Sequence, residues 1–295
     1  MRFYTLEING KCRPAVSVDC GKTAYTFASL GIDIPDIASF IRYDCDANLE
    51  ALKTALEKVD NAKAVDLDTA NICAPIMYPD QDVICLGINY NEHATEAAGF
   101  SKEAFGGERP YTIYFSKRVS CASGNGDAIP AYEGLVDGLD YEVELGVVLG
   151  RNVKDVDEWE AMDSVFGYTI INDVSARNLQ TRHKQWYLGK SLDGFTPMGP
   201  CIVTPDEIGD PDKLNISCTV NGELRQNSNT GNMIQSVGGA IVELSAGMTL
   251  KAGTIIATGT PSGVGMGFDP PRFLKSGDTI ICSIEGIGDI VNYVE

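Results

Sequence analysis

Short apolar stretches separated by glycine-rich turns recur along the chain from residue 83 onward. Apolar runs of about four to eight residues bounded by turn signals are typical of β-strands. The pattern predicts strands at residues 83–88, 113–115, 142–149, 165–171, 201–203, 214–220, 254–258 and 278–284. Helical spacing of apolar residues is rarer and predicts helices at residues 92–98, 158–161, 175–185 and 233–244. Because strands and helices do not alternate regularly, we expect an α+β fold with a large, curved and mostly antiparallel sheet.

The first 75 residues have a pattern of their own. Strands are predicted on both sides of the turn Asn9-Gly10, and a helix is predicted at residues 49–59. Prolines then interrupt the chain before the strands of the larger part begin. We therefore expect a small β-rich N-terminal domain at residues 1–75 and a larger catalytic domain at residues 76–295.

The composition narrows the classes of function. Asp and Glu outnumber Lys and Arg by 41 to 23, and the formal net charge is −18. Nucleic-acid-binding proteins carry a basic surface, so we expect no nucleic-acid partner. The sequence has no run of about 18 apolar residues and no signal-peptide pattern at its start, so we expect a cytoplasmic protein with no membrane partner. Nine cysteines are scattered singly, and we expect them to be small buried residues in a reducing compartment.

Two glycine-containing segments match nucleotide-binding loops only in part. Gly21-Lys22-Thr23 lacks the leading glycine of a phosphate-binding loop because Val16 occupies its place. The glycines at positions 263, 265 and 267 are followed by two prolines, where a dinucleotide-binding loop would open a helix. A nucleotide cofactor is therefore disfavoured.

Two carboxylates share one face of the strand predicted at residues 142–149. Glu142 and Glu144 flank Val143, and residues two apart in a strand point to the same side about 6.5–7 Å apart. Burying two like charges costs several kcal/mol unless a cation lies between them, so a metal ion would resolve the conflict. A solvent-exposed strand face is the alternative that this pattern leaves open.

A third carboxylate follows the strand predicted at residues 165–171. Asp173 lies near the capping position of the helix predicted at residues 175–185, and Arg177 and Gln180 follow it on one helical face. An acid in line with Arg and Gln suits a metal ion together with an anionic, oxygen-rich ligand. Carboxylate oxygens favour Mg²⁺ or Mn²⁺, with Ca²⁺ also suitable, over Zn²⁺, which prefers His or Cys.

The sequence contains two histidines, His93 and His183, that can supply an imidazole base. His93 and Glu96 are three residues apart in a predicted helix, so the carboxylate can orient the ring and stabilise its charged form. The pair predicts a general base, and an exposed helical ion pair is the open alternative. His183 lies among Arg and Lys residues and is expected to be non-catalytic.

Five motifs occur in order between residues 83 and 295 and together resemble the fumarylacetoacetate hydrolase family. They are GINYNEH at 87–93, YEVELG at 141–146, NDVSARNLQ at 172–180, GKSLDGFTPMGP at 189–200 and TGTPSGVG at 258–265. The resemblance implies a mixed β-sandwich roll and a homodimer. It further implies a divalent metal held by Glu142, Glu144 and Asp173, which agrees with the site reached from spacing.

The resemblance also implies roles for other residues of this sequence. His93 and Glu96 would act as a general base or activate water, and Lys190 would be the cation beside the substrate oxygen at the metal. Residues implied to contact the substrate or line its pocket are Tyr90, Arg177, Gln180 and Thr260. Residues 98–108, which have small residues near both ends, resemble a lid that closes over the site.

These expectations together indicate a metal-dependent enzyme for a small anionic 2-oxo or diketo acid. The leading prediction is hydrolysis of a carbon–carbon bond in an acylpyruvate-like or diketo acid, through a metal-stabilised enolate and an activated water. The alternative is an isomerase, decarboxylase or dehydratase of a related 2-oxo acid, for example of oxaloacetate or 2-hydroxyhepta-2,4-diene-1,7-dioate. A non-catalytic module that binds a metal or ligand is a third interpretation.

Overall fold

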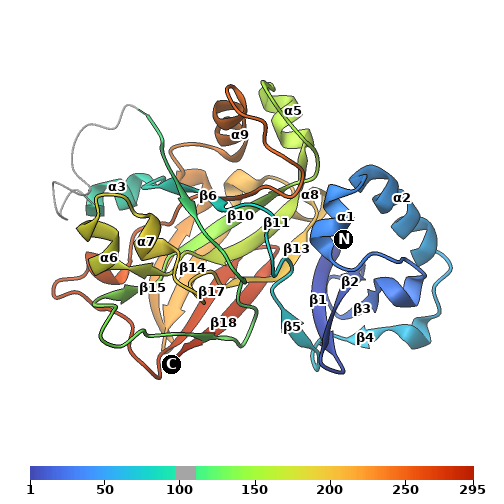
Figure 1. Cartoon of the computed structure of the whole chain (residues 1–295), viewed down its shortest axis with the longest axis horizontal. Helices are drawn as coiled ribbons and strands as arrows, with labels where there is room; N and C mark the ends of the chain where they lie inside the picture. Colours follow the sequence, from blue (N-terminus) through green and yellow to red (C-terminus); the bar gives the residue numbers. More distant parts are fainter. Residues whose placement is uncertain (98–110) are drawn as a thin grey trace.

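One large β-sheet runs through most of the molecule (Figure 1). The structure is a computed structural model, and it describes residues 1–97 and 111–295. The lid expected at residues 98–108 therefore lies outside the described residues. No helix in the described part of the chain is both long and apolar enough to cross a membrane.

The large sheet has 11 strands. They are β1 (Arg2–Ile8), β2 (Lys11–Ser17), β3 (Thr23–Thr26), β4 (Val65–Asp66), β5 (Asn71–Cys73), β6 (Val83–Gly87), β7 (Ile113–Lys117), β10 (Val143–Leu149), β11 (Val165–Asn172), β13 (Met198–Val203) and β16 (Ile255–Ala257). Their order is β4-β3-β2-β1-β13-β11-β10-β16-β6-β7, with β5 paired to β1. Neighbouring strands are antiparallel except for β6 and β16, which agrees with the predicted mostly antiparallel sheet.

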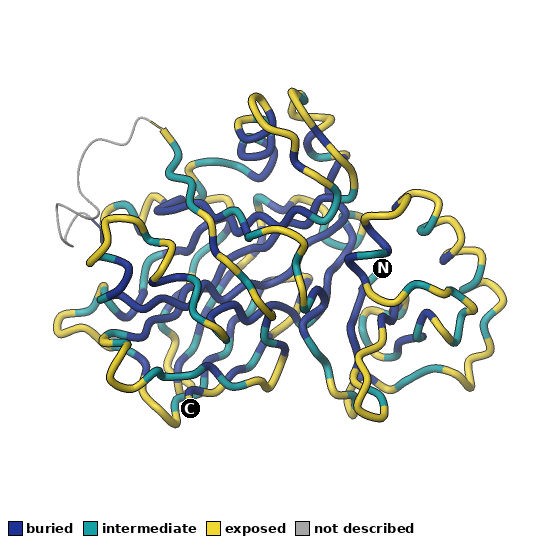
Figure 2. The backbone as a smooth tube through the Cα atoms, in the orientation of Figure 1, coloured by how far each residue is buried: buried dark blue, intermediate teal, exposed yellow. Residues whose placement is uncertain are grey.

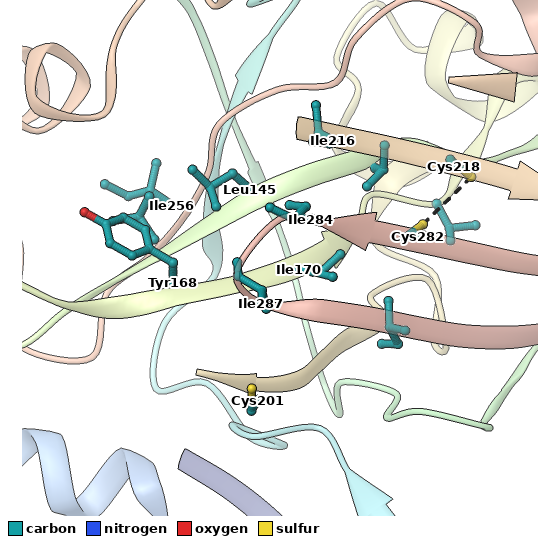
Figure 3. Packing of buried hydrophobic residues seen from close by; sticks show 14 of the residues in the cluster. Leu145, Tyr168, Ile170, Cys201, Ile216, Cys218, Ile256, Cys282, Ile284 and Ile287 are labelled. Atoms are coloured by element: carbon teal, nitrogen blue, oxygen red, sulfur yellow. Dashed lines mark hydrogen bonds between the residues drawn. The ribbon is translucent and has the colours of Figure 1, made fainter. Parts of the chain in front are cut away.

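A second sheet packs against the large one. Its strands are β8 (Ala128–Ile129), β14 (Asn215–Val220), β15 (Glu223–Asn229), β17 (Thr279–Ile284) and β18 (Gly288–Val294), in the order β15-β14-β17-β18-β8. Leu145 and Ile170 of the large sheet share a buried core with Ile216 and Ile284 of the second sheet (Figure 3). Two sheets packed face to face confirm the predicted mixed β-sandwich roll within an α+β fold.

Short helices surround the sheets. They are α1 (Ile37–Arg42), α2 (Cys45–Leu56), α3 (Asn91–Ala97), α5 (Glu158–Asp163), α6 (Arg177–Arg182), α7 (Tyr187–Lys190), α8 (Pro205–Ile208) and α9 (Val237–Ser245). Single 3₁₀ turns are η1 (Phe27–Leu30), η2 (Asn61–Lys63), η3 (Pro211–Lys213), η4 (Thr230–Asn232) and η5 (Gly265–Gly267). In Figure 1, α1 and α2 lie beside the N-terminal strands, whereas α3, α6 and α7 gather at the opposite end of the molecule.

The N-terminal strands continue the large sheet. β1 pairs with β13, and Phe3 lies opposite Ile202 in that pairing. The Phe3 ring also packs against Phe40 and Phe166, with ring centroids 5.5 and 4.9 Å apart. The two parts of the chain therefore share backbone hydrogen bonds and an aromatic core. The boundary between residues 75 and 76 stays a prediction.

One predicted helix is wrong in its first turn. Residues 175–185 were expected to be helical, but Ser175–Ala176 form the short strand β12, which pairs with β9 (Leu139–Asp140). The helix α6 starts only at Arg177, and its cap residue Ala176 offers no side-chain hydrogen bond. Asp173 therefore does not cap this helix, because pairing with a distant strand holds the following residues extended.

The prediction that the cysteines are buried is confirmed for five of the nine. All nine cysteines are free thiols. The buried ones are Cys45, Cys85, Cys201, Cys218 and Cys282. Cys12, Cys20 and Cys121 are exposed, which corrects the expectation that every cysteine is buried. Each lies in a turn, a loop or the end of a strand, and Figure 2 shows that exposed backbone is concentrated in such connecting segments.

The turn between β2 and β3 depends on one carboxylate, Asp19. It accepts hydrogen bonds from the backbone N–H groups of Lys22 (3.1 Å) and Thr23 (3.0 Å). The hydroxyls of Thr23 and Ser17 also donate to it, at 2.7 and 2.8 Å. Burial raises the pKa of Asp19, but these hydrogen bonds outweigh burial and lower the pKa to about 2.

We expect Asp19→Asn to lower the free energy of unfolding by about 1 kcal/mol at neutral pH, because hydrogen bonds to a charged acceptor are stronger than those to a neutral amide oxygen. An Asp has a pKa of about 3.9 in an unfolded chain, so its lowered folded-state pKa stabilises the fold above about pH 4. That contribution disappears as the pH falls toward 2. Urea unfolding at pH 7 and pH 3 tests this, because the difference between wild type and variant should shrink at the lower pH.

Candidate active site

Three carboxylates converge where β10 and β11 lie side by side. Glu142 immediately precedes β10, Glu144 lies within β10, and Asp173 immediately follows β11. The antiparallel pairing of Val143 with Asn172 brings them together. One oxygen from each carboxylate lies within 4.8 Å of the others, and all three residues are buried. The alternative of a solvent-exposed strand face is therefore wrong.

Backbone hydrogen bonds hold this cluster in shape. The Glu142 N–H donates to Asn172 Oδ1 at 3.0 Å, and the Asp173 N–H donates to the Glu142 carbonyl at 2.8 Å. The Gly259 N–H donates to Glu144 Oε2 at 2.8 Å. Each carboxylate is thus fixed by chain segments that are far apart in the sequence.

Three buried cations contact the carboxylates. Lys190 Nζ lies 2.5 Å from Glu142 Oε2 and 2.5 Å from Asp173 Oδ2. Arg177 Nη1 lies 2.7 Å from Glu142 Oε1, and Lys117 Nζ lies 2.6 Å from Asp173 Oδ1. Two of these cations, Lys190 and Arg177, were predicted. Together the three offset much of the buried negative charge, which would otherwise be costly.

Lys117 was missed by the sequence analysis. It ends β7, is completely buried, and also donates to the Val174 carbonyl at 3.1 Å. Burial lowers its pKa and outweighs the attraction of Asp173, while nearby Lys190 lowers the pKa further. The one signal in the sequence was a lysine directly after an apolar strand, a position where an exposed lysine is far more common.

The three carboxylates differ in their electrostatic surroundings. Burial raises the pKa of Glu142, but Lys190 and Arg177 outweigh burial and lower that pKa to about 2. Glu144 has no salt-bridge partner among the described residues, and burial, Asp173 and Glu142 raise its pKa well above the usual value. Burial lowers the pKa of Lys190, but Asp173 and Glu142 outweigh burial and raise it. Glu144 is thus the carboxylate whose negative charge most lacks compensation.

The cluster has the donor set of a site for a hard divalent cation. It offers carboxylate oxygens, and no His or Cys belongs to it. Oxygen-only sites suit Mg²⁺, Mn²⁺ or Ca²⁺. Lys190 contacts both Glu142 and Asp173, so an ion between these carboxylates would displace its ammonium from at least one of them.

His93 and Glu96 form the predicted pair within α3. His93 Nδ1 lies 2.7 Å from Glu96 Oε2, and the Gly263 N–H donates to Glu96 Oε1 at 3.0 Å. A Cβ at Gly267 would lie 1.9 Å from Glu96 Oε1, so only glycine fits there. His93 is buried, with its side chain 8% exposed, which rules out an exposed helical ion pair. The carboxylate contacts Nδ1 and thereby fixes the orientation of the imidazole ring.

Arg177 and Gln180 lie together as predicted. Arg177 Nη1 donates to Gln180 Oε1 at 2.9 Å, and Arg177 Nε donates to Asp140 Oδ2 at 2.9 Å. Arg177 Nη2 is buried and has no hydrogen-bond partner among the described residues. Sequence reasoning missed Asp140, a fully buried carboxylate just before the two glutamates, although its place beside that motif was a usable signal. Asp140 anchors the guanidinium through Nε, and the Nη2 amino group remains available to a ligand.

Of the other two residues predicted to contact the substrate or line its pocket, Thr260 lines the cavity and Tyr90 does not. Thr260 lines the cavity, donates to the Val143 carbonyl at 3.0 Å and accepts from Gln226 Nε2 at 2.8 Å. Tyr90 is completely buried, is not among the residues that line the cavity, and its hydroxyl has no hydrogen-bond partner in residues 1–97 and 111–295. Gln226 was not predicted, and nothing in the sequence pattern marked it.

A small cavity of about 20 Å³ joins these groups. Its polar side is formed by His93, Glu142, Glu144, Arg177, Gln180, Lys190 and Thr260. Its apolar side is formed by Leu86, Ile88, Phe115 and Trp186. The arrangement places an imidazole, two carboxylates and two cations around one small space. Groups of this kind can remove a proton from an anionic carbon acid and stabilise the product.

Comparison with known proteins gives a consistent result. The family profile described as "Fumarylacetoacetate (FAA) hydrolase C-terminal" matches residues 82–295. A relative from Bacillus subtilis (strain 168), the oxaloacetate tautomerase YisK, is 47% identical over 228 residues, which cover 77% of this chain and 74% of the relative.

Solved structures resemble the entire chain. The fumarylacetoacetate hydrolase of psychrophilic Exiguobacterium antarcticum is 38% identical with a TM-score of 0.83, and the match covers 100% of this chain and 99% of that one. The maleylpyruvate hydrolase of Sphingobium sp. SYK-6, in complex with manganese(II) and pyruvate, is 28% identical with a TM-score of 0.78, and the match covers 100% and 98%. The similarity therefore extends over the N-terminal strands as well as the sandwich.

Proposed function

Because this chain belongs to the fumarylacetoacetate hydrolase family, we propose that it is a metal-dependent enzyme that forms the enolate of a small 2-oxo acid. The observation that carries the proposal is the shared cavity: Glu142 and Glu144 of the carboxylate cluster line it together with Lys190, Arg177 and His93. Glu96 contacts the His93 ring at Nδ1. Its leading reaction is keto–enol tautomerisation of an oxaloacetate-like acid, the activity for which the Bacillus relative is named.

Glu142, Glu144 and Asp173 would hold the metal, which is Mg²⁺ or Mn²⁺ in this proposal, and Ca²⁺ fits the same oxygen set. When bound, the cation would supply Lewis-acid stabilisation of the negative charge that develops on the substrate oxygens. Manganese with pyruvate in the Sphingobium structure supports both the metal class and the ligand class. We also propose that the protein is a homodimer, as its family resemblance implies.

The cations of the site would bind and orient the anionic substrate. Arg177 would donate its unpaired Nη2–H group to the substrate carboxylate, with Asp140 and Gln180 keeping the guanidinium in place. Lys190 would place its charge beside the keto oxygen, where charge accumulates when the proton leaves. Thr260 lines the same cavity and would complete its polar side. The net charge of −18 repels anions at long range, so these local charges decide capture.

His93 would move the proton. Its Nε2 would accept the proton from the carbon beside the keto group and return it to oxygen, while Glu96 keeps Nδ1–H oriented. Carbon–carbon hydrolysis is the second candidate, because the same Nε2 could instead take a proton from an attacking water. The hydrolase names of the Exiguobacterium and Sphingobium structures favour this alternative.

We expect His93→Gln to lower kcat by about 10²- to 10⁴-fold, the usual contribution of a positioned general base. Metal affinity should be unchanged, since His93 does not belong to the carboxylate cluster. The assay follows the ultraviolet absorbance of enol-oxaloacetate with Mg²⁺ present, and product analysis with acetylpyruvate detects hydrolysis.

His183→Gln is the matched control, because His183 is exposed and far less constrained. It should retain wild-type rates. Full activity of His93→Gln on both substrates would remove His93 from the mechanism. Loss on acetylpyruvate alone would assign the pair to water activation and favour the hydrolase.

A further inference from the structure

The apolar side of the cavity contains three large residues, Ile88, Phe115 and Trp186, called here the apolar wall. We propose that the apolar wall limits the substrate to short 2-oxo acids that carry no bulky group beyond about the fourth carbon. This inference rests on the proposed function, since it concerns the substrate of that same site. Three separate observations indicate that the wall is rigid and close to the reacting groups.

The first observation is that the Trp186 ring packs directly against Gly87. A Cβ at Gly87 would lie 2.4 Å from Cζ3 of the indole, so the ring lies directly on the β6 backbone. Phe115 packs against the same indole edge-on, with ring centroids 5.1 Å apart and an interplanar angle of 67°. Trp186 is therefore held between the β6 backbone and an aromatic neighbour, and cannot retreat toward β6 to admit a larger ligand.

The second observation is backbone strain at Ile88. Its φ angle is +55°, a left-handed conformation that is strongly disfavoured for a β-branched residue. The neighbouring Asn89 holds this turn, because its Nδ2 donates to the carbonyls of Thr258 and Gln235 at 2.8 and 3.0 Å. Strain of this kind persists only where the surroundings enforce it, and here it holds the Ile88 side chain at the cavity.

The third observation is the closeness of the wall to the charged groups. Lys190 Nζ lies 5.3 Å from the centroid of the Phe115 ring. The cation that would stabilise the substrate oxygen is thus next to the wall. The wall therefore closes the apolar side of the cavity directly beside this cation, and a substituent that extends from the substrate in that direction would meet the indole.

Binding of two 2-oxo acids of different length in the presence of Mg²⁺ tests the proposal. We expect wild-type protein to bind pyruvate at least about 10-fold more tightly than 4-methyl-2-oxopentanoate by isothermal calorimetry. Trp186→Ala should reduce this ratio at least about fivefold by admitting the branched chain, and Trp186→Phe should fall between. A general loss of folding or of site geometry would weaken both ligands and leave the ratio unchanged.

Trp159 provides the matched control because it is the other tryptophan of the chain and is 74% exposed on α5. Trp159→Ala should keep the wild-type ratio. Trp159→Phe leaves Trp186 as the single tryptophan, and its fluorescence should change on pyruvate binding. Equal affinities in wild type would overturn the apolar-wall proposal while leaving the proposed function intact. So would an unchanged ratio in Trp186→Ala with wild-type affinity for pyruvate, and where Trp186→Ala weakens both ligands, an unchanged ratio in Trp186→Phe would do the same. Absence of Mg²⁺-dependent binding of pyruvate would overturn the proposed function and this inference with it.

Discussion

Glu144→Gln is expected to abolish metal-dependent turnover, with kcat/KM falling at least about 10³-fold and metal affinity at least about 100-fold. Changes to groups that merely orient metal ligands already cost about 10- to 100-fold, so loss of a ligand charge costs more. Glu144 is the carboxylate without a cation partner among the described residues, and its main fixed contact is the Gly259 N–H. The amide oxygen of Gln can keep that hydrogen bond, so the change removes charge and little else.

Two measurements separate this effect from misfolding. Urea unfolding in EDTA should show that Glu144→Gln is no less stable than wild type, because a buried and poorly compensated acid has been replaced by a neutral group. Calorimetry with Mg²⁺ and Mn²⁺ then reports the loss of binding. Glu243→Gln is the control, since Glu243 is exposed and bonded to the Tyr114 hydroxyl far from the carboxylates. Wild-type metal affinity in Glu144→Gln would contradict the assignment of the cluster as the metal site.

Lys117→Met is expected to lower the free energy of unfolding in EDTA by about 2–3 kcal/mol. This is less than the roughly 3–5 kcal/mol for a buried charge left with no partner, because Lys190 still contacts Asp173. Asp173 is completely buried and has two cation contacts, Lys117 at 2.6 Å and Lys190 at 2.5 Å. Methionine fills a similar volume but carries no charge. Saturating Mg²⁺ should restore much of the lost stability, because a divalent cation beside Asp173 replaces the missing positive charge and binds the folded state alone.

Urea unfolding followed by circular dichroism, with EDTA and with Mg²⁺, measures both parts of this prediction. Lys251→Met, at an exposed position, should leave stability unchanged within about 0.5 kcal/mol. An equal loss of stability with and without Mg²⁺ would show that Lys117 acts through packing rather than through its charge.

The chemistry of the site was predictable from short-range spacing. Glu142 and Glu144 share a face because side chains alternate in a strand, and His93 and Glu96 meet because a helix brings residues three apart together. The structure confirms both relations at distances set by a single strand or a single helix. Sequence motifs that resemble a known family added Lys190 and Thr260, which no spacing argument singled out.

Contacts between segments that are far apart in the sequence could not be predicted from short-range spacing. Ser175–Ala176 is extended because it pairs with Leu139–Asp140, so local helical spacing across residues 175–185 was misleading. The apolar wall likewise combines the residue after β6, one residue of β7 and the residue before α7, and their proximity depends on the tertiary fold. Which strands pair and which distant side chains become neighbours is determined by the whole fold.

The buried charges of the site show most clearly what the sequence predicts and what only the tertiary structure decides. The spacing of Glu142, Glu144 and Asp173 indicated a cation, with a solvent-exposed strand face as the alternative that the sequence left open. Which of the 23 Lys and Arg residues would meet them was decided by the tertiary structure, which buries Lys117, 56 residues from Asp173, against that carboxylate. The physical reason is that a buried charge must be compensated within a few ångströms in space, whereas distance along the chain places no such limit.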